Sequence, residues 1–202
     1  MRQLLLFFTV TIIIVACKGR TSVSQETAND KVTVKLEYDT VQVKIIDGWK
    51  ILNTQNYSIQ YPPDWVLDTN QTLESFTLYA PQKNHKDSFK TKIDLSIDDL
   101  NGKNYGFNKY AELLETDITS SFDNYKIIER NLIKKDSTEY RTFTFTGDFP
   151  SDEGGTWHME LEDYIYIYKN KAYSIEFVGE ENNFIRFKEV SEKIMRTFKI
   201  KE

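Results

Sequence analysis

Apolar and polar residues alternate along most of the chain, and this two-residue period predicts β-strands. The stretch Lys92–Leu100 shows it best, because Ile93, Leu95 and Ile97 fall on one side of a strand and the polar residues between them fall on the other. Shorter runs bounded by Gly, Pro, Asn or Asp predict further strands. These runs are Lys31–Ile46 (two strands turning near Asp39-Thr40), Trp49–Leu52, Tyr57–Tyr61, Trp65–Asp68, Ser75–Tyr79, Lys126–Lys134, Glu139–Thr146, Trp157–Tyr168 and Tyr173–Val178.

Two segments instead have the period of an amphipathic helix. Apolar residues recur three or four positions apart from Gly106 to Phe122 and again from Asn183 to Phe198, with Asn182 as the predicted N-terminal cap. Strands and helices do not alternate strictly, which favours an antiparallel arrangement over a doubly wound parallel sheet. The sequence therefore predicts an α+β fold, in which an antiparallel β-sheet of about six to seven strands has helices packed on its faces.

Connections between the elements are marked by turn-forming residues. Asp47-Gly48 and Asn101-Gly102 predict tight turns, and Asn170-Lys171 predicts the turn between the last two strands. The polar stretch Asp148–Gly155 predicts a loop between two long strands. An N-terminal hairpin with so few residues is barely stable alone in water, so it must dock onto the main domain or remain loose.

The first residues predict an export signal rather than part of the fold. Arg2 provides a positive charge, residues 4–15 are almost entirely apolar, and Ala16 is the small residue before the expected cut. A membrane-spanning helix needs about 20 apolar residues, so this stretch is too short for one. The alternative is a short membrane anchor, and the signal peptide Met1–Ala16 is the favoured interpretation.

The end of this segment, Ile14-Val15-Ala16-Cys17, resembles the lipobox of bacterial lipoproteins. The resemblance implies cleavage before Cys17 and attachment of lipid, including palmitate, to its sulfur. Cys17 is the single cysteine of the chain, and several acyl chains together give stable membrane anchoring. The sequence thus predicts a protein held at a membrane through lipid on Cys17.

The predicted organisation has four parts. Residues 1–16 form the signal peptide, and residues 17–30, which lack aromatic side chains and are mostly polar, form a flexible tether. Residues 31–48 form an N-terminal strand segment. Residues 49–202 form the main domain, where most of the aromatic side chains lie.

Net charge narrows the set of partners. The chain has 26 Lys and Arg against 31 Asp and Glu, a formal charge of −5. Proteins that bind nucleic acid carry a basic surface, so no nucleic-acid partner is predicted. Several frequent catalytic motifs are absent from the sequence, among them the G-x-S-x-G elbow, the P-loop and G-x-G-x-x-G. No catalytic residue and no cofactor are predicted.

The strand Trp157–Tyr168 carries the weak candidates for a metal site. His158, Glu160 and Glu162 share one side of it, and imidazole and carboxylate groups are both acceptable zinc ligands. An exposed polar strand face explains the same pattern and is favoured. Oxygen-rich stretches that do not match the spaced loop of a calcium site include Asp94, Ser96, Asp98 and Asp99, and Asp148, Asp152 and Glu153; the second histidine, His85, lies in a polar loop.

Three tyrosines continue the same side of that strand. Tyr164, Tyr166 and Tyr168 either pack beneath a helix or form an exposed binding face, since tyrosine is enriched at interfaces. Packing beneath a helix is the favoured interpretation.

Two stretches resemble PsbP-like domains. Tyr57–Trp65 (YSIQYPPDW) has the aromatic strand, proline and tryptophan of their opening. Ala172–Phe177 (AYSIEF), followed by a polar turn and an amphipathic helix ending near Thr197-Phe198, is similar to their ending. The resemblance covers residues 49–201 and implies an antiparallel sheet with helices on its faces. Members are mostly non-catalytic; one docks on photosystem II and a yeast relative binds a small GTPase, but no functional residue carries over.

These observations favour a lipid-anchored protein of the bacterial cell envelope, facing the periplasm or the exterior, with a non-enzymatic domain that binds another envelope protein. The alternative is an envelope hydrolase or a binder of small ligands or metal ions that uses an acidic, tyrosine-rich cleft. The presence of a pocket with convergent polar groups distinguishes the two.

Overall fold

The computed structural model describes residues 31–36, 39–69, 75–82, 89–103, 105–135, 138–151 and 154–201. Side chains are described from residue 47 onward, except at 135 and 138. Cys17, His85, Asp152 and Glu153 lie outside the described residues, as do the predicted signal peptide and tether. No helix in the described ranges is long and apolar enough to cross a bilayer.

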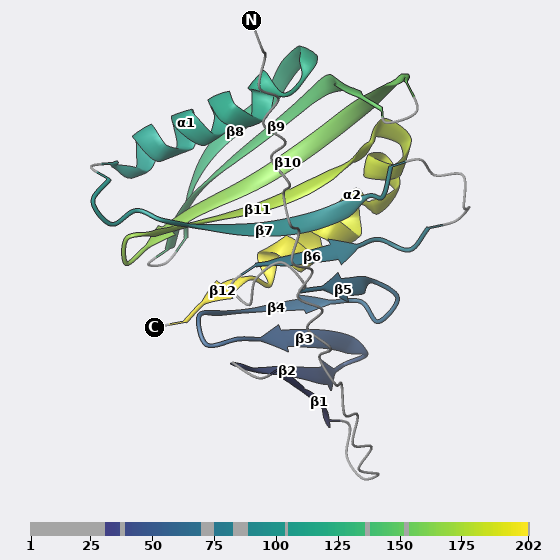
Figure 1. Ribbon diagram of the computed structural model, residues 1–202, viewed down its shortest axis with the longest axis vertical. Coiled ribbons are helices and arrows are strands. Elements are labelled where there is room, and N and C mark those ends of the chain that lie inside the picture. Colours follow the sequence, from purple (N-terminus) through teal and green to yellow (C-terminus); the bar gives the residue numbers. More distant parts are fainter. Residues whose placement is uncertain are drawn as a thin grey trace, which may run out of the picture.

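Two antiparallel sheets and two helices make up the described structure (Figure 1). The helices are α1 (Phe107–Ser120) and α2 (Glu181–Arg196). The smaller sheet contains β1 (Lys31–Leu36), β2 (Asp39–Ile46), β3 (Trp49–Asn53), β4 (Tyr57–Tyr61) and β12 (Lys199–Ile200), in that order. The larger sheet contains β5 (Val66–Asp68), β6 (Phe76–Tyr79), β7 (Lys92–Asp99), β8 (Asp123–Lys135), β9 (Thr138–Pro150), β10 (Thr156–Tyr168) and β11 (Lys171–Glu180).

The larger sheet confirms the predicted fold class. Its seven strands have the order β5-β6-β7-β11-β10-β9-β8, and every neighbouring pair is antiparallel. Helix α1 packs on one side of this sheet and α2 on the other (Figure 1). We call these two sides the α1 face and the α2 face.

The core on the α2 face joins three layers. Phe184 and Ile194 of α2 are fully buried between Phe177 of the larger sheet and Ile59 of the smaller sheet, and Trp65 packs edge-on against Phe187. A second buried cluster lies on the α1 face, where residues of α1 cover apolar side chains of β9 and β10. Its buried members are Leu100, Tyr110, Ala111, Phe143, Phe145, Met159, Leu161, Ile165, Ala172 and Val178.

The N-terminal strands extend the smaller sheet. The pairing of β1 with β2 confirms the predicted hairpin, and β2 pairs with β3 from Gln42 to Ile46 across the predicted segment boundary. Asp47 and Gly48 both have positive φ angles, 50° and 80°, which match the twist of a two-residue hairpin turn. The predicted turn near Asp39-Thr40 is wrong, because Leu36 pairs with Asp39 and both residues 39 and 40 lie inside β2.

Other predicted boundaries are displaced by a few residues. The turn between β10 and β11 is Lys169-Asn170, with φ angles of 46° and 57°, because Lys171 already pairs with Tyr168. The predicted loop starts later, since Asp148 pairs with His158 inside the sheet. Asn182 is not the cap of α2: β11 runs directly into the helix, and Glu180 occupies the cap position without a side-chain hydrogen bond.

Candidate functional site

The predicted two-sided pattern of β10 is confirmed. Met159, Leu161 and Ile165 are buried on the α1 face, whereas His158 is 77% exposed on the other side. His158 Nδ1 contacts a carboxylate oxygen of Asp148 on the neighbouring strand β9. The amide of Asn124 donates to the same carboxylate at 2.9 Å, and this hydrogen bond is the main reason why the pKa of Asp148 is lowered. His158 is therefore part of a surface contact between strands.

The other two metal candidates lie farther along β10, next to α2. Burial raises the pKa of Glu160 and of Glu162, and the nearby Glu192 raises that of Glu162 further. Residues four apart on a strand are about 13 Å apart along its axis, which is too far for His158 and Glu162 to share an ion. Across the residues that the structure describes, no three His, Cys, Asp or Glu side chains gather closely enough to hold a metal ion.

The tyrosines of β10 pack beneath α2, as the favoured interpretation predicted. Tyr164 and Tyr166 are buried, and the ring of Tyr140 stacks on both, with centroids 5.6 Å and 5.0 Å away. Tyr166 also contacts Phe198 just beyond the helix, and Arg196 of α2 hydrogen-bonds the Tyr164 hydroxyl. These rings stabilise the layer between the sheet and α2, and the third tyrosine, Tyr168, is partly buried against the same cluster.

The α1 face contains a row of carboxylates that the sequence reading missed. Asp163 of β10 pairs with Glu176 of β11, and Glu176 pairs with Asp94 of β7. Residues directly opposite on neighbouring antiparallel strands have Cβ atoms about 4.5–5.5 Å apart, so three acidic side chains lie side by side. The row ends at Thr77 of β6, whose hydroxyl donates to Asp94 at 2.6 Å.

The carboxylates of this face differ in their ion-pair and hydrogen-bond partners. Asp94 forms an ion pair with Lys92, 2.7 Å between the charged atoms. Asp163 is fully buried; Ser174 donates to one of its oxygens at 2.7 Å, and the other oxygen has no hydrogen-bond partner among the described residues. Four residues along β7 from Asp94, Tyr110 of α1 donates to Asp98 at 2.6 Å.

Burial changes the acidity of this row. Desolvation raises the pKa of Asp163 from 3.8 to about 7, although the Ser174 hydrogen bond opposes the change. The pKa of Glu176 rises from 4.5 to about 8, chiefly through burial and also through the nearby Asp163 and Asp94. Two carboxyl groups in the middle of the sheet therefore hold protons at a pH where ordinary carboxyl groups are ionised.

Two hollows open on the α1 face on either side of Lys92. The larger, about 590 Å³, lies over β6 and β7, and its walls include Thr77, Asp94 and Ser96. The smaller, about 270 Å³, lies between the end of α1 and the sheet, with mostly apolar walls and Glu176 among them. No residue of α1 lines the larger hollow, so α1 leaves this half of the face open.

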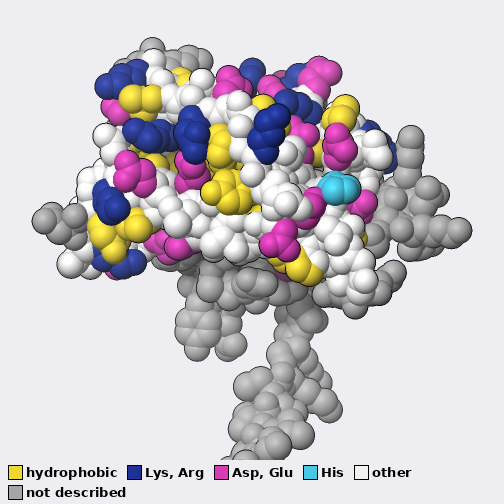
Figure 2. All heavy atoms as spheres, turned by 90° about the horizontal axis from the view of Figure 1, so that it is seen from above, with side chains coloured by type: hydrophobic (Ala, Val, Ile, Leu, Met, Phe, Trp, Pro, Cys, Tyr) yellow, Lys and Arg dark blue, Asp and Glu magenta, His cyan; other side chains and the backbone are white. Residues whose placement is uncertain are grey.

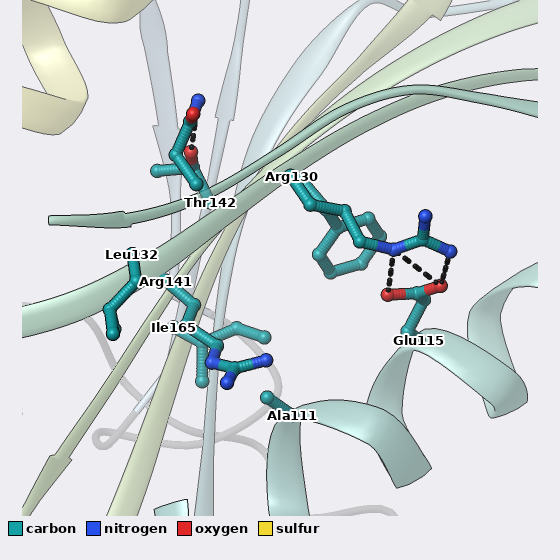
Figure 3. Close-up of a pocket in the computed structure, with 9 residues that line it drawn as sticks. Ala111, Glu115, Arg130, Leu132, Arg141, Thr142 and Ile165 are labelled. Carbon is teal, nitrogen blue, oxygen red and sulfur yellow. Dashed lines mark hydrogen bonds and ion pairs between the residues drawn. The ribbon is translucent and has the colours of Figure 1, made fainter. Parts of the chain in front are cut away.

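A third hollow, about 190 Å³, lies beneath the middle of α1 (Figure 3). Arg130 of β8 and Arg141 of β9 extend toward the helix, and Glu115 of α1 meets the guanidinium of Arg130 (Figure 3). The floor is apolar, with Phe143 and Ile165 almost completely buried. We call this hollow the arginine pocket. No sequence motif marked these arginines, because they come from two strands and become neighbours only through strand pairing.

The view from the top of Figure 1 shows no continuous apolar patch among the described residues (Figure 2). Seen from this side, hydrophobic side chains form small separate groups among acidic and basic side chains (Figure 2). Large exposed apolar side chains in the described structure are scattered, and three of them, Tyr125, Ile128 and Leu132, lie on the edge strand β8. In the described structure, the α1 face is therefore distinguished by its hollows and not by an exposed apolar patch.

Solved structures share this architecture at very low sequence identity. Cyanobacterial PsbP from Synechocystis sp. PCC 6803 is 10% identical, with a TM-score of 0.53 over 78% of this chain and 95% of its own. The Ran-binding protein Mog1p of Saccharomyces cerevisiae is 8% identical, with a TM-score of 0.50 over 71% and 89%. LpqN of Mycobacterium tuberculosis, involved in cell envelope biogenesis, is 10% identical, with a TM-score of 0.47 over 72% and 83%.

Sequence comparison adds no assignment of its own, since no family model and no curated protein matches the chain. The likeness to the first two structures covers most of both chains, and it agrees with the two stretches that resemble PsbP-like domains. The chain therefore has the PsbP-like fold.

Proposed function

We propose that the protein is a lipid-anchored component of the bacterial cell envelope, and that its PsbP-like domain binds an envelope protein without catalysing a reaction. The anchor is supported by Ile14-Val15-Ala16-Cys17, and the polar residues 17–30 allow the domain to stand away from the bilayer. A binding role agrees with that of one structural neighbour, the Ran-binding protein Mog1p. Because similarity of fold does not establish function, the proposal depends on the surface itself.

The open half of the α1 face is the observation that supports binding best. Its hollow of about 590 Å³ is lined in part by polar side chains of β6 and β7, and three of these are fixed by one another. Lys92 and Thr77 both contact Asp94, which holds the lining in place before a partner arrives. A preorganised polar surface of this kind suits docking, because little side-chain entropy is lost on association.

Photo-crosslinking tests the docking surface directly. We expect p-benzoylphenylalanine in place of Ser96, an exposed residue of the larger hollow, to crosslink the full-length protein to one reproducible envelope protein in intact cells. The matched control carries the same group in place of Ile185, which is 63% exposed on α2 on the opposite face of the sheet. Failure to crosslink from position 96, or the same product from both positions, contradicts docking through the α1 face.

Substitution of Cys17 tests the anchor. With Ser in place of Cys17, the sulfur that would carry the lipid is absent, and we expect the protein to move from the membrane fraction to the soluble fraction. A single acyl chain binds membranes only marginally, and several are needed for stable attachment. The measurement is the distribution of the protein after cell fractionation, with the wild-type chain as reference. Unchanged membrane association of Cys17→Ser contradicts the lipid anchor.

A small-ligand role is favoured by one separate observation, the arginine pocket. It does not depend on the anchor or on the open half of the α1 face, and its chemistry is specific enough to name a class of ligand.

A further inference from the structure

The two arginines of the arginine pocket differ in how their charges are balanced. Arg130 forms a bidentate contact with Glu115, with nitrogen–oxygen distances between 2.5 and 3.1 Å, and this hydrogen bonding raises its pKa. Arg141 donates to the neutral side-chain oxygen of Asn108 at 2.6 Å and lies over the ring of Phe107 at 5.8 Å. The pocket therefore has one guanidinium charge more than it has carboxylates.

One nitrogen of Arg141 is left without a partner. Its Nε atom is buried and makes no hydrogen bond to any part of the chain that the structure describes. A buried donor without an acceptor is unfavourable by about 1–3 kcal/mol, and more when the group is charged. Native proteins normally satisfy such a donor, so an acceptor from outside the chain is the simplest completion of this site.

The walls restrict what that acceptor can be. Ala111, Phe143 and Ile165 present apolar surface beside the guanidinium groups, and the hollow of about 190 Å³ accommodates only a small molecule. Carboxylates accept from a guanidinium through charge-assisted hydrogen bonds. Because Glu115 already neutralises Arg130, the single remaining positive charge matches a monoanion better than a doubly charged phosphate.

We propose that the arginine pocket binds a small monocarboxylate anion, with Arg141 donating to the carboxylate and the apolar floor contacting a short hydrocarbon group. Arg130 is held by Glu115 at the rim of the pocket, which leaves Arg141 as the uncompensated positive charge. The site is independent of the lipid anchor and of partner docking, because it lies under α1 and shares no lining residue with the larger hollow.

Binding is measured on the full-length protein in mild detergent by following the Nε–H resonances of its arginines during titration at constant ionic strength. The probes are sodium acetate, sodium propionate, sodium phosphate and sodium chloride. We expect a saturable shift of the Arg141 resonance with both carboxylates, stronger with propionate because of the apolar floor. Phosphate and chloride should produce no saturable shift of that resonance.

Three variants assign the effect. Arg141→Met keeps an unbranched apolar stem without the guanidinium charge and should abolish binding as followed by thermal shift. Arg141→Lys keeps the charge without the planar donor edge and should weaken binding roughly tenfold. Arg186→Met is the matched control, because Arg186 also lies over a phenylalanine ring, 4.5 Å from its centroid, but on α2; it should leave binding unchanged.

Two further variants keep the proposal testable if Arg141→Met does not fold. Glu115→Gln removes the carboxylate that neutralises Arg130 and should tighten propionate binding, an effect that a purely structural role of the pocket would not produce. Ala111→Leu fills the hollow from the helix and should block binding. The proposal is overturned by a lack of saturable carboxylate binding, by equal binding to Arg141→Lys, or by tighter binding of phosphate than of propionate.

Discussion

Replacing Phe184 by alanine is expected to lower the free energy of unfolding by about 3–5 kcal/mol. The side chain is fully buried in the first turn of α2, and its ring stacks on Phe177 of β11 with centroids 4.5 Å apart. Alanine removes the ring and leaves a cavity where the helix meets the sheet. Single domains are stable by only about 5–15 kcal/mol in total, so this one change removes a large share of the stability.

The measurement is chemical unfolding of the full-length protein in mild detergent, followed by tryptophan fluorescence. Ile185→Ala is the matched control, because Ile185 is the next residue of the same helix and is 63% exposed. Ile185→Ala should lower the free energy of unfolding by no more than about 0.5 kcal/mol. Equal losses from the two substitutions would contradict the placement of α2 on the larger sheet.

The second large effect is a pH dependence set by Asp163 and Glu176. Both carboxyl groups have raised pKa values in the folded state, about 7 and about 8, against ordinary values of 3.8 and 4.5. At a pH between the ordinary and the raised pKa values, the folded protein holds more protons than the unfolded chain does. The free energy of unfolding is therefore expected to fall as the pH rises from about 4 to about 8, and each pKa unit corresponds to about 1.4 kcal/mol.

The double variant Asp163→Asn with Glu176→Gln removes both titrating groups. It should be about as stable as the wild type at pH 5 and more stable by several kcal/mol at pH 8.5, since neither side chain can ionise. The measurement is unfolding by urea across this pH range at constant ionic strength. If the free energy of unfolding changed equally with pH in the wild type and the variant, the burial of these carboxyl groups would be contradicted.

Ser174→Ala tests the same pH dependence by raising the pKa of Asp163 instead of removing the carboxyl group. The Ser174 hydroxyl donates to Asp163 and favours its ionised form. Without this donor the pKa of Asp163 should rise further, so the loss of stability should extend to higher pH than in the wild type. A shift in the other direction would show that the hydroxyl does not stabilise the carboxylate.

Local periodicity was sufficient to predict most of the architecture. The alternation along Lys92–Leu100 and Trp157–Tyr168 placed the right residues on the right faces, and the packing of Tyr164 under a helix followed from its position on the strand. Boundaries were less well predicted. Asn182 is a good cap residue, yet α2 begins two residues earlier than predicted, because β11 runs straight into the helix.

The candidate sites could not be predicted, because cross-strand pairing creates them. Asp163 and Glu176 are thirteen positions apart and become neighbours only through the β10–β11 register. Asp163 also occupies a core position between Leu161 and Ile165, where the pattern predicts an apolar residue. The arginine pocket needs the register of β8 with β9 and the placement of α1 above them. Neither relation is encoded in a contiguous motif.

Intact-mass spectrometry of the protein isolated from its native cells tests the proposed lipid anchor most directly. If the account is right, the mass corresponds to a chain that starts at Cys17 and carries covalently attached acyl chains. A chain that retains Met1, or that has an unmodified Cys17 thiol, would show that the domain is not held at the membrane by lipid.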